Sequence, residues 1–280
     1  DHRDLHSFPT RRSSDLSGPT NSMRGAAFLS DLKDAIVVDV GGTTTDVGVL
    51  QQGFPRVAAT AVTIGGVRTN FRMPDTLSIG LGGGSIIQEN PIKVGPQSVG
   101  FELTQKAQVF GGGVLTATDI AVAGGLASVG DRDHVSKIDS TLIKNIIGQI
   151  QEMVSVAVDR MKTSASLVPA VIVGGGSILI QDQIEGTSEI VKPNHYSVAN
   201  AIGAAIAQVG GETDRVFSLA EMSRDEALAE AKTEATDRAV SAGAQADTIE
   251  IVDVEEVPLA YLPGNATRIM VKAVGDLAGN

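Results

Sequence analysis

The stretch DAIVVDVGGTTTDVGVLQQG, residues 34–53, decides the fold of this chain. Residues 34–40 are a short apolar run rich in β-branched side chains, which predicts a buried strand. Gly41 and Gly42 let the backbone turn sharply, and residues 47–53 continue directly as a second strand. The stretch therefore predicts a β-hairpin with a polar bend.

The bend brings together three kinds of group that interact with phosphate and its counter-ion. Two glycines let backbone N–H groups approach a ligand closely, and three threonine hydroxyls can donate to phosphate oxygens. Asp39 and Asp46 bracket the bend and repel phosphate, so we expect them to hold a hydrated Mg²⁺ or to orient a water molecule. The candidate phosphate-binding residues are Gly41, Gly42, Thr43, Thr44 and Thr45.

Other interpretations fit this bend less well. The turn contains no lysine, which argues against a Walker loop, and a strand rather than a helix follows it, which argues against a dinucleotide fingerprint. A plain hairpin turn decorated with polar side chains is the simplest alternative. The arrangement Asp-x-Gly-Gly-Thr-x-x-Asp over residues 39–46 favours phosphate binding over that alternative.

A second glycine turn follows the apolar strand of PAVIVGGGS, residues 169–177. Glycines at the end of a strand let the backbone approach an adenine ring or a ribose without side-chain collision. An ordinary strand-to-helix turn explains the same residues about as well. Its place after the hairpin, with a long helix between, favours the nucleotide interpretation. The candidate adenosine-contacting residues are Gly174, Gly175, Gly176 and Ser177.

Strand-like and helix-like segments alternate along the rest of the chain, which predicts an α/β fold. The expected strands are 56–64, 247–259 and 267–277, the last two joined by a turn at 263–265, and the expected helices are 119–128, 139–162, 197–210 and 223–243. The charged helix 223–243 is most simply a solvated face, with a contact to another protein chain as the alternative.

Composition excludes several classes of function. The formal net charge of −11 argues against an extended surface for DNA or RNA. No apolar run approaches the length of a membrane span, so we expect no membrane insertion. The chain has no cysteine, which fits a reducing cytoplasm. His134 and His195 are expected at the surface or in caps, and no His/Asp/Glu spacing predicts a zinc site.

Residues 1–16 are polar and unpatterned and resemble a translated sequencing-adapter artefact. An ordinary disordered terminus is the alternative. In either case we exclude the segment from the fold, and we expect the natural protein to extend further upstream. The expected division of the remainder is a nucleotide-binding domain over 17–212 and a C-terminal helix and β-hairpin extension over 213–280.

Several motifs occur in the order known from one protein family. The chain resembles the A-type members of the hydantoinase/oxoprolinase family, a branch of the actin-like superfamily that also contains sugar kinases and heat-shock chaperones. The resemblance covers about residues 17–277. The motifs that carry it are SGPTNSMRGA, AIVVDVGGTTTDVG, GLGGGSI, VGPQSVG, LTATDIAVAGG, VIVGGGS and NHYSVANAIGAA.

The resemblance implies an actin-like, ribonuclease H-like domain with a mixed sheet flanked by helices and a C-terminal α+β extension. It implies Mg²⁺ and ATP, with Asp39 and Asp46 in the metal shell, residues 41–45 on the phosphates and residues 174–177 on adenosine. Asp119 matches a family motif, and we expect it to be a helix N-cap. The glycine run at 82–84 is expected to be a turn, with a place in the lining of the cleft as the alternative. Ser17, Gly18 and Pro19 match a family motif and are expected to be structural, with a possible cleft contact.

The resemblance also implies ATP-dependent opening of cyclic amides, often with a second, B-type subunit or by self-association. Ketone carboxylation is the alternative within the family. A nucleotide-driven chaperone-like module and a small-molecule kinase are the alternatives within the superfamily. The family has another acidic hairpin near its true N-terminus, and this chain shows only one. We therefore expect the isolated chain to be inactive.

Overall fold

The computed structural model describes residues 11–56, 63–64, 67–68, 74–206, 208–260, 262–276 and 278. The chain divides into two compact units, Asp1–Ala204 and Ala205–Asn280. This division lies eight residues before the one expected at 212/213. The reason is that strand β11 (Gln208–Ser218) pairs along its whole length with a strand of the second unit.

The first unit is built on a mixed sheet whose central strand is β1 (Ala35–Val40). On one side β1 pairs antiparallel with β2 (Thr45–Gln51), which confirms the predicted hairpin. On its other side it pairs parallel with β9 (Val168–Val173), the strand predicted before the second glycine turn. Three further strands complete the sheet: β10 (Thr187–Val191) beside β9, and β3 (Phe54–Pro55) and β6 (Thr76–Ile79) beside β2.

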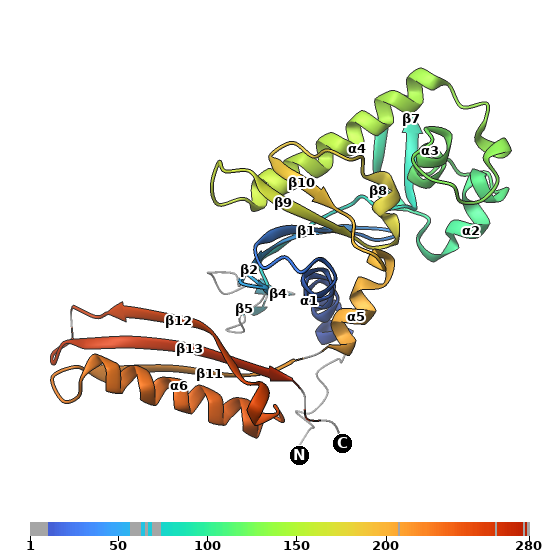
Figure 1. The fold of residues 1–280 in the computed structure, drawn as a ribbon. Coiled ribbons are helices and arrows are strands. Elements are labelled where there is room, and N and C mark those ends of the chain that lie inside the picture. Colours follow the sequence, from blue (N-terminus) through green and yellow to red (C-terminus); the bar gives the residue numbers. More distant parts are fainter. Residues whose placement is uncertain are drawn as a thin grey trace, which may run out of the picture. The chain divides into compact units, whose positions relative to one another are not determined.

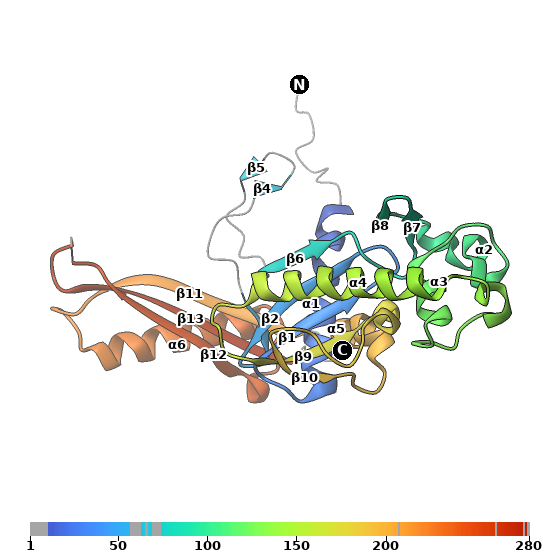
Figure 2. The same cartoon turned by 90° about the horizontal axis from the view of Figure 1, so that it is seen from above.

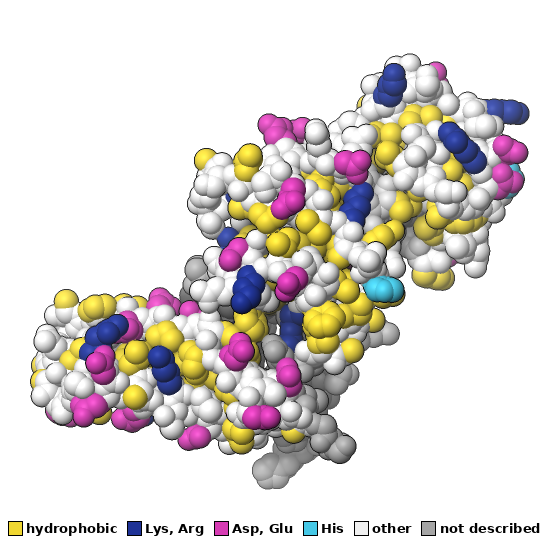
Figure 3. All heavy atoms as spheres, in the orientation of Figure 1, with side chains coloured by type: hydrophobic (Ala, Val, Ile, Leu, Met, Phe, Trp, Pro, Cys, Tyr) yellow, Lys and Arg dark blue, Asp and Glu magenta, His cyan; other side chains and the backbone are white. Residues whose placement is uncertain are grey.

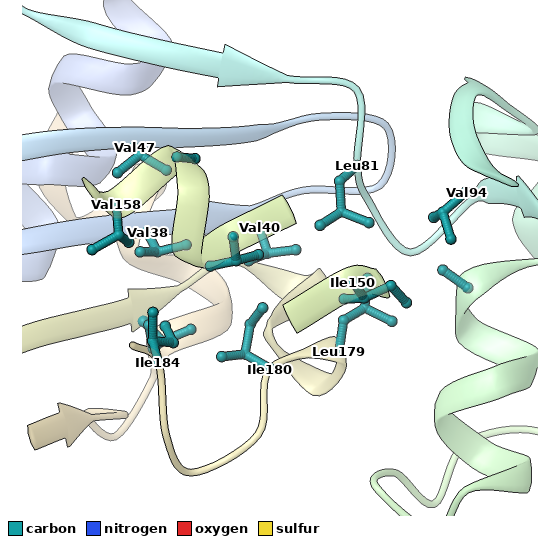
Figure 4. Close-up of a cluster of buried hydrophobic side chains, with 14 of the residues drawn as sticks. Val38, Val40, Val47, Leu81, Val94, Ile150, Val158, Leu179, Ile180 and Ile184 are labelled. Atoms are coloured by element: carbon teal, nitrogen blue, oxygen red, sulfur yellow. The ribbon is translucent and has the colours of Figure 1, made fainter. Parts of the chain in front are cut away.

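Helices α1 (Arg11–Ser30) and α4 (Ser140–Met161) cover opposite faces of this sheet (Figures 1 and 2). The alternation of side chains along β1 explains the two layers. Val38 and Val40 belong to the cluster that includes the buried face of α4 (Figure 4), whereas Val37 belongs to the cluster that includes α1. Burying each such side chain contributes roughly 1.5–3 kcal/mol. Both faces of the strand therefore hold it in place.

Helix α4 matches its prediction at both ends. The side chain of Asp139 caps its first turn by accepting bonds from the N–H groups of Thr141 and Leu142, both at 2.9 Å. The residues buried along one stripe recur at helical spacing. They are Ile146, Ile150, Val154, Ala157, Val158 and Met161.

The chain between β6 and α4 is rich in glycine and forms several short elements of the first unit. Strands β7 (Ser85–Glu89) and β8 (Ile92–Ser98) form an antiparallel pair. Helix α3 runs over Ala117–Ala123 and is shorter than the expected 119–128, because Gly124 ends it and Gly125 adopts a positive φ of 78°. The remaining short elements are α2 (Leu103–Lys106), the two-residue strands β4 (Thr63–Ile64) and β5 (Val67–Arg68), and the 3₁₀ turns at Gly100–Glu102, Gln108–Phe110, Arg132–Val135, Gly175–Leu179 and Tyr196–Val198.

The helix predicted over 197–210 is shorter in the structure. Helix α5 spans Ala199–Ala205, and the chain enters β11 at Gln208. Residues 208–210 belong to a strand instead of the predicted helix, because β11 pairs with β13 (Ala266–Asp276) and this pairing outweighs the helix preference of the small residues. The expected close packing does occur, because a Cβ at Gly203 would lie 2.8 Å from the backbone nitrogen of Gly25 in α1.

The second unit is a three-stranded antiparallel sheet with one helix on it. The strand order is β11, β13 (Ala266–Asp276) and β12 (Glu250–Pro258), and the last two form the predicted pair around the predicted turn. Helix α6 (Arg224–Ser241) begins with a capping box between Ser223 and Glu226. The residues it buries against the sheet are Ala227, Ala231, Ala235 and Ala239.

Basic and acidic side chains are interspersed over the second unit on the face drawn in Figure 3. Arg215, for example, lies 2.8 Å from Glu230 and 3.0 Å from Glu234. Within the described ranges, no helix is long and apolar enough to cross a membrane.

Two predicted segments, 1–16 and 56–64, lie partly outside the residues that the structure describes. Helix α1 begins at Arg11, so it extends into the segment 1–16 that was expected to lie outside the fold. The expected strand 56–64 falls mostly on residues 57–62, outside the described residues.

Candidate functional site

The bend between β1 and β2 is the exposed tip of the hairpin. The last register pair is Val40 with Thr45, and the N–H of Gly41 donates to the carbonyl of Thr44 at 2.9 Å, which closes the turn. The residues at the tip, Gly42, Thr43 and Thr44, are exposed. Their N–H groups and the two hydroxyls are therefore available to an anion.

Thr45 is placed differently from its two neighbours. Its side chain is fully buried, and its hydroxyl donates to the carbonyl of Leu81 at 2.8 Å. The hydroxyl expected to donate to phosphate thus ties the base of the bend to the segment before the glycine run at 82–84.

That glycine run packs directly against the bend. The N–H of Gly83 donates to the carbonyl of Gly41 at 3.0 Å, and the N–H of Gly84 donates to that of Gly42 at 2.7 Å. A Cβ at Gly82 would lie only 2.5 Å from the amide nitrogen of Thr43. Residues 82–84 form the expected turn, in which the N–H of Ser85 donates to the carbonyl of Gly82 at 3.0 Å, and only residues without side chains allow the close approach to the bend. The signal in the sequence was three successive glycines between Leu81 and Ser85.

The second predicted glycine turn lies against the same bend. Gly174 has a φ of +87°, and a Cβ there would collide with Oδ1 of Asp39 and with the carbonyl oxygen of Val40. A Cβ at Gly176 would collide with the carbonyl oxygen of Gly41. By contrast, Gly175 is exposed and has open space around it. The two glycine turns that were expected to form one site are therefore neighbours.

Ser177 lies at the buried side of this turn. It is 2% exposed, and its N–H donates to the carbonyl of Gly174 at 3.2 Å. The N–H of Gly174 in turn donates to the carbonyl of Tyr196 at 2.9 Å. Of the four residues expected to contact adenosine, Gly175 presents its backbone outward, whereas Gly176 and Ser177 are buried.

Asp39 and Asp46 face each other across the hairpin as register partners. Partial burial raises the pKa of Asp39, the hydrogen bond with Ser22 of α1 lowers it, and the negative charge of Asp46 raises it; the net direction is upward. Asp46 accepts a short hydrogen bond from the hydroxyl of Ser78 on β6. The pair concentrates negative charge at the foot of the bend. Ser22 and Ser78 were not expected at the site from the sequence.

The end of β8 adds another side chain to the bend. The hydroxyl of Ser98 donates to the carbonyl of Gly42 at 3.3 Å and lies 3.5 Å from the hydroxyl oxygen of Thr43. It accepts a bond from the N–H of Gly100 at 3.0 Å. Ser98 lies in VGPQSVG, one of the quoted family motifs, although no role had been expected for it.

Asp119 is not the N-cap that the sequence suggested. Thr116 is the N-cap of α3, and Asp119 is the third helical residue of a capping box. Its fully buried carboxylate accepts bonds from the N–H of Val109 and the N–H of Thr116, both at 2.7 Å, and from the hydroxyl of Thr116 at 2.8 Å. It thus joins the start of α3 to the turn at 107–111. The sequence signal for the N-cap was Thr116, because a hydroxyl residue three positions before an acidic one can form a capping box with it.

The residues present suit magnesium better than a metal that is bound by protein ligands alone. In the part of the chain that the structure describes, no group of three or more His, Cys, Asp or Glu side chains can enclose a metal ion. Mg²⁺ keeps several waters and binds through one or two carboxylates together with phosphate oxygens. Asp39 and Asp46 supply that number of carboxylates beside the exposed bend. Neither His134, which is exposed, nor His195 belongs to the bend.

The fold and the site together define a class of protein. A central hairpin, two parallel strands beside it, helices on both faces and an acidic glycine-threonine bend make up a mixed α/β fold of the kind expected for an actin-like domain, here followed by an antiparallel sheet. Residues 8–128 match the model of the hydantoinase/oxoprolinase family. Over this range, which is less than half of the chain, the sequence is similar to that family.

One curated protein and two solved structures are similar to this chain. The chain is 30% identical over 126 residues to the acetophenone carboxylase gamma subunit of Aromatoleum aromaticum, which covers 42% of this chain and 17% of that relative. Two solved structures share the fold with a TM-score of 0.63 and 16% identity, each over 94% of this chain. They are a nucleotide-free acetone carboxylase, of which 49% is covered, and an ATP-dependent caprolactamase from Pseudomonas jessenii, of which 50% is covered. The chain thus spans about half the length of these solved structures.

Proposed function

We propose that this chain is the nucleotide-binding half of an ATP-dependent enzyme that opens cyclic amides. The observation that carries the proposal is the convergence of two glycine loops, 82–84 and 174–176, on an exposed acidic bend. Close approach of three backbone segments creates a site for a large polyanion with a counter-ion. The caprolactamase among the solved relatives is, by its name, an ATP-dependent enzyme for a cyclic amide.

The bend residues have distinct roles in this proposal. Backbone N–H groups of Gly42, Thr43 and Thr44, with the two exposed hydroxyls, bind phosphate oxygens. The side chain of Thr45 holds the bend on the Leu81 segment instead of contacting the ligand. Gly175 gives the ribose or adenine a flat backbone surface, and Gly174, Gly176 and Ser177 shape the turn that presents it.

Asp39 and Asp46 hold the water shell of a magnesium ion in this proposal. Bound Mg²⁺-ATP would supply a phosphoryl group that activates the amide oxygen toward attack by water. The pKa of Asp39 is raised first by partial burial and then by the negative charge of Asp46, and a cation beside the two carboxylates would offset both effects. Ser22 holds Asp39 and Ser78 holds Asp46, each by a hydrogen bond.

Titration calorimetry with ATP, with and without Mg²⁺, tests nucleotide binding by this chain. We expect heat of binding only when Mg²⁺ is present and a loss of binding of at least about tenfold in Asp46→Ala, because one carboxylate of the pair is gone. Asp237→Ala is the matched control, since Asp237 is an exposed aspartate on α6 of the second unit. Absence of magnesium-dependent uptake by the unaltered chain would contradict the proposal.

A substrate panel tests the reaction on the complete gene product. Hydantoin, N-methylhydantoin, 5-oxoproline and caprolactam are cyclic amides, and we expect one of them to stimulate release of phosphate together with ring opening. Asp46→Ala is expected to abolish that turnover. A stable phosphorylated product would indicate a small-molecule kinase, and ATPase activity that only a polypeptide stimulates would indicate a chaperone-like module.

A ketone carboxylase is the second candidate. Its support is the fold shared with acetone carboxylase and the sequence relationship to the acetophenone carboxylase gamma subunit. Acetone and acetophenone with bicarbonate therefore belong in the same panel. Stimulation by a ketone only when bicarbonate is present would favour carboxylation over amide hydrolysis. Both candidates leave room for a second, B-type subunit or for self-association, because one relative is itself described as a subunit.

A further inference from the structure

We propose that Thr118 is a positioning residue that sets the shape of the phosphate-binding bend through the glycine loop 82–84. Thr118 lies in the first turn of α3 and does not itself reach the bend. The inference rests on the proposed function of that bend, and it gives the Thr118-Asp119 motif a role in it.

The first link runs from α3 to the glycine loop. Thr118 is 2% exposed, and its hydroxyl donates to the carbonyl of Gly83 at 2.8 Å. Its N–H donates to the same carbonyl at 3.0 Å. A Cβ at Gly83 would lie 3.0 Å from the Thr118 hydroxyl oxygen, so a larger residue there would push the two apart. One threonine thus holds a single carbonyl in the middle of the loop with two donors.

The second link runs from the glycine loop to the bend. The same peptide segment that accepts from Thr118 donates through Gly83 and Gly84 to the carbonyls of Gly41 and Gly42. These two carbonyls belong to the residues that turn the bend. A shift of Gly83 is therefore transmitted to the backbone whose N–H groups face the anion, because close-packed backbone does not deform independently.

The start of α3 is itself fixed in place. The buried carboxylate of Asp119 accepts three hydrogen bonds, from Val109 and Thr116, and these anchor the first turn of the helix. Thr118 therefore extends from a rigid support. Binding sites are most exact when a second layer of hydrogen bonds holds the residues that touch the ligand.

Three variants separate the hydroxyl of Thr118 from its bulk. Thr118→Val keeps the shape and removes the hydroxyl, whereas Thr118→Ser keeps the hydroxyl and removes the methyl group. Thr213→Val is the matched control. Thr213 is 1% exposed, lies on β11 in the second unit, and has a buried hydroxyl without a hydrogen-bond partner.

Each variant is tested by calorimetry with Mg²⁺-ATP and by hydrogen exchange of the Gly83 and Gly84 amides without nucleotide. We expect Thr118→Val to bind Mg²⁺-ATP about tenfold more weakly and to exchange these two amides faster, in keeping with the loss of one buried hydrogen bond. Thr118→Ser and Thr213→Val are expected to retain the affinity and the exchange rates of the unaltered chain.

Equal affinity of Thr118→Val and the unaltered chain would overturn the inference, and so would equal losses in the Val and Ser variants. Failure of the unaltered chain to bind Mg²⁺-ATP would refute the proposed function instead. In that case the exchange rates decide about Thr118 separately: unchanged rates for Gly83 and Gly84 in Thr118→Val would refute the positioning role as well.

Discussion

Asp39 and Asp46 are register partners next to the bend of the β1–β2 hairpin, and the charge of Asp46 contributes to the raised pKa of Asp39. Directly opposed residues of an antiparallel pair have Cβ atoms about 4.5–5.5 Å apart, and like charges at that separation destabilise the fold. The hairpin keeps both carboxylates nonetheless. Such a cost is typical of a functional site rather than of a structural one.

We predict that Asp39→Asn stabilises the chain at pH 7. Because the folded state raises the pKa of Asp39, it binds more protons than the unfolded state between the ordinary aspartate pKa and the raised value. The free energy of unfolding therefore falls as pH rises through that window, and the penalty is complete above it. Asparagine removes the charge and still accepts a bond from Ser22. Urea denaturation of both proteins between pH 4 and pH 8 measures the effect.

The gain from Asp39→Asn is expected to shrink toward pH 4, because the Asp39 carboxyl of the folded state takes up a proton as the pH falls through its raised pKa. Asp237→Asn in α6 serves as the control and should show no such pH-dependent gain. An Asp39→Asn protein that is no more stable than the unaltered chain at pH 7 would mean that desolvation and repulsion do not dominate at this position.

We predict that two adjacent glycines respond differently to alanine. A Cβ at Gly176 would collide with the carbonyl oxygen of Gly41 and lie 2.8 Å from Cγ1 of Val40, whereas a Cβ at Gly175 would meet nothing within 4 Å. Gly176→Ala is expected to destabilise the first unit by about 1–3 kcal/mol through overpacking. Gly175→Ala is expected to change stability by less than about 0.5 kcal/mol. Chemical denaturation measures the stability of both variants. Similar stabilities would show that the turn shifts easily to make room for the added methyl group.

We predict that Asp119→Ala destabilises the first unit by about 2–4 kcal/mol, because it leaves the buried N–H groups of Val109 and Thr116 without their acceptor. Glu226→Ala is the matched control. Glu226 holds the same position in the capping box of α6, where it is exposed to solvent. The loss of stability in Glu226→Ala, measured by urea denaturation, should be clearly smaller. Equal losses would argue that burial of Asp119 adds nothing to an ordinary cap.

We predict that Gly211 tolerates alanine much less well than Gly210. A Cβ at Gly211 would collide with the carbonyl oxygen of Ala235 and the nitrogen of Ala239 in α6, whereas one at Gly210 would lie 3.4 Å from the carbonyl oxygen of Ala273, an ordinary contact. Gly211→Ala should destabilise the second unit by about 1–3 kcal/mol. Hydrogen exchange of β13 amides measures it. If the β13 amides exchange at the same rate in both variants, α6 must be able to move away from the sheet.

The hairpin, the second glycine turn, helix α4 and the terminal strand pair could be predicted because their signals are local. Alternation, helical spacing and glycine turns act within a few residues. The helix expected over 197–210 was wrong at its end for the opposite reason. Its small residues are compatible with helix, but β11 gains a full ladder of hydrogen bonds with β13, about 60 residues away at their centres.

By itself, the sequence determined that this chain has a central strand followed by an acidic glycine-threonine bend, and its motifs resemble those of the hydantoinase/oxoprolinase family. Tertiary structure alone decided which groups at that bend are available. It buried the Thr45 hydroxyl against Leu81, turned Ser98 and Ser22 toward the hairpin and packed the Gly82 loop against the bend. These contacts join residues 17 to 56 positions apart in the chain. Local propensity and periodicity carry no information about such pairs, because they form only when separate elements pack around one core.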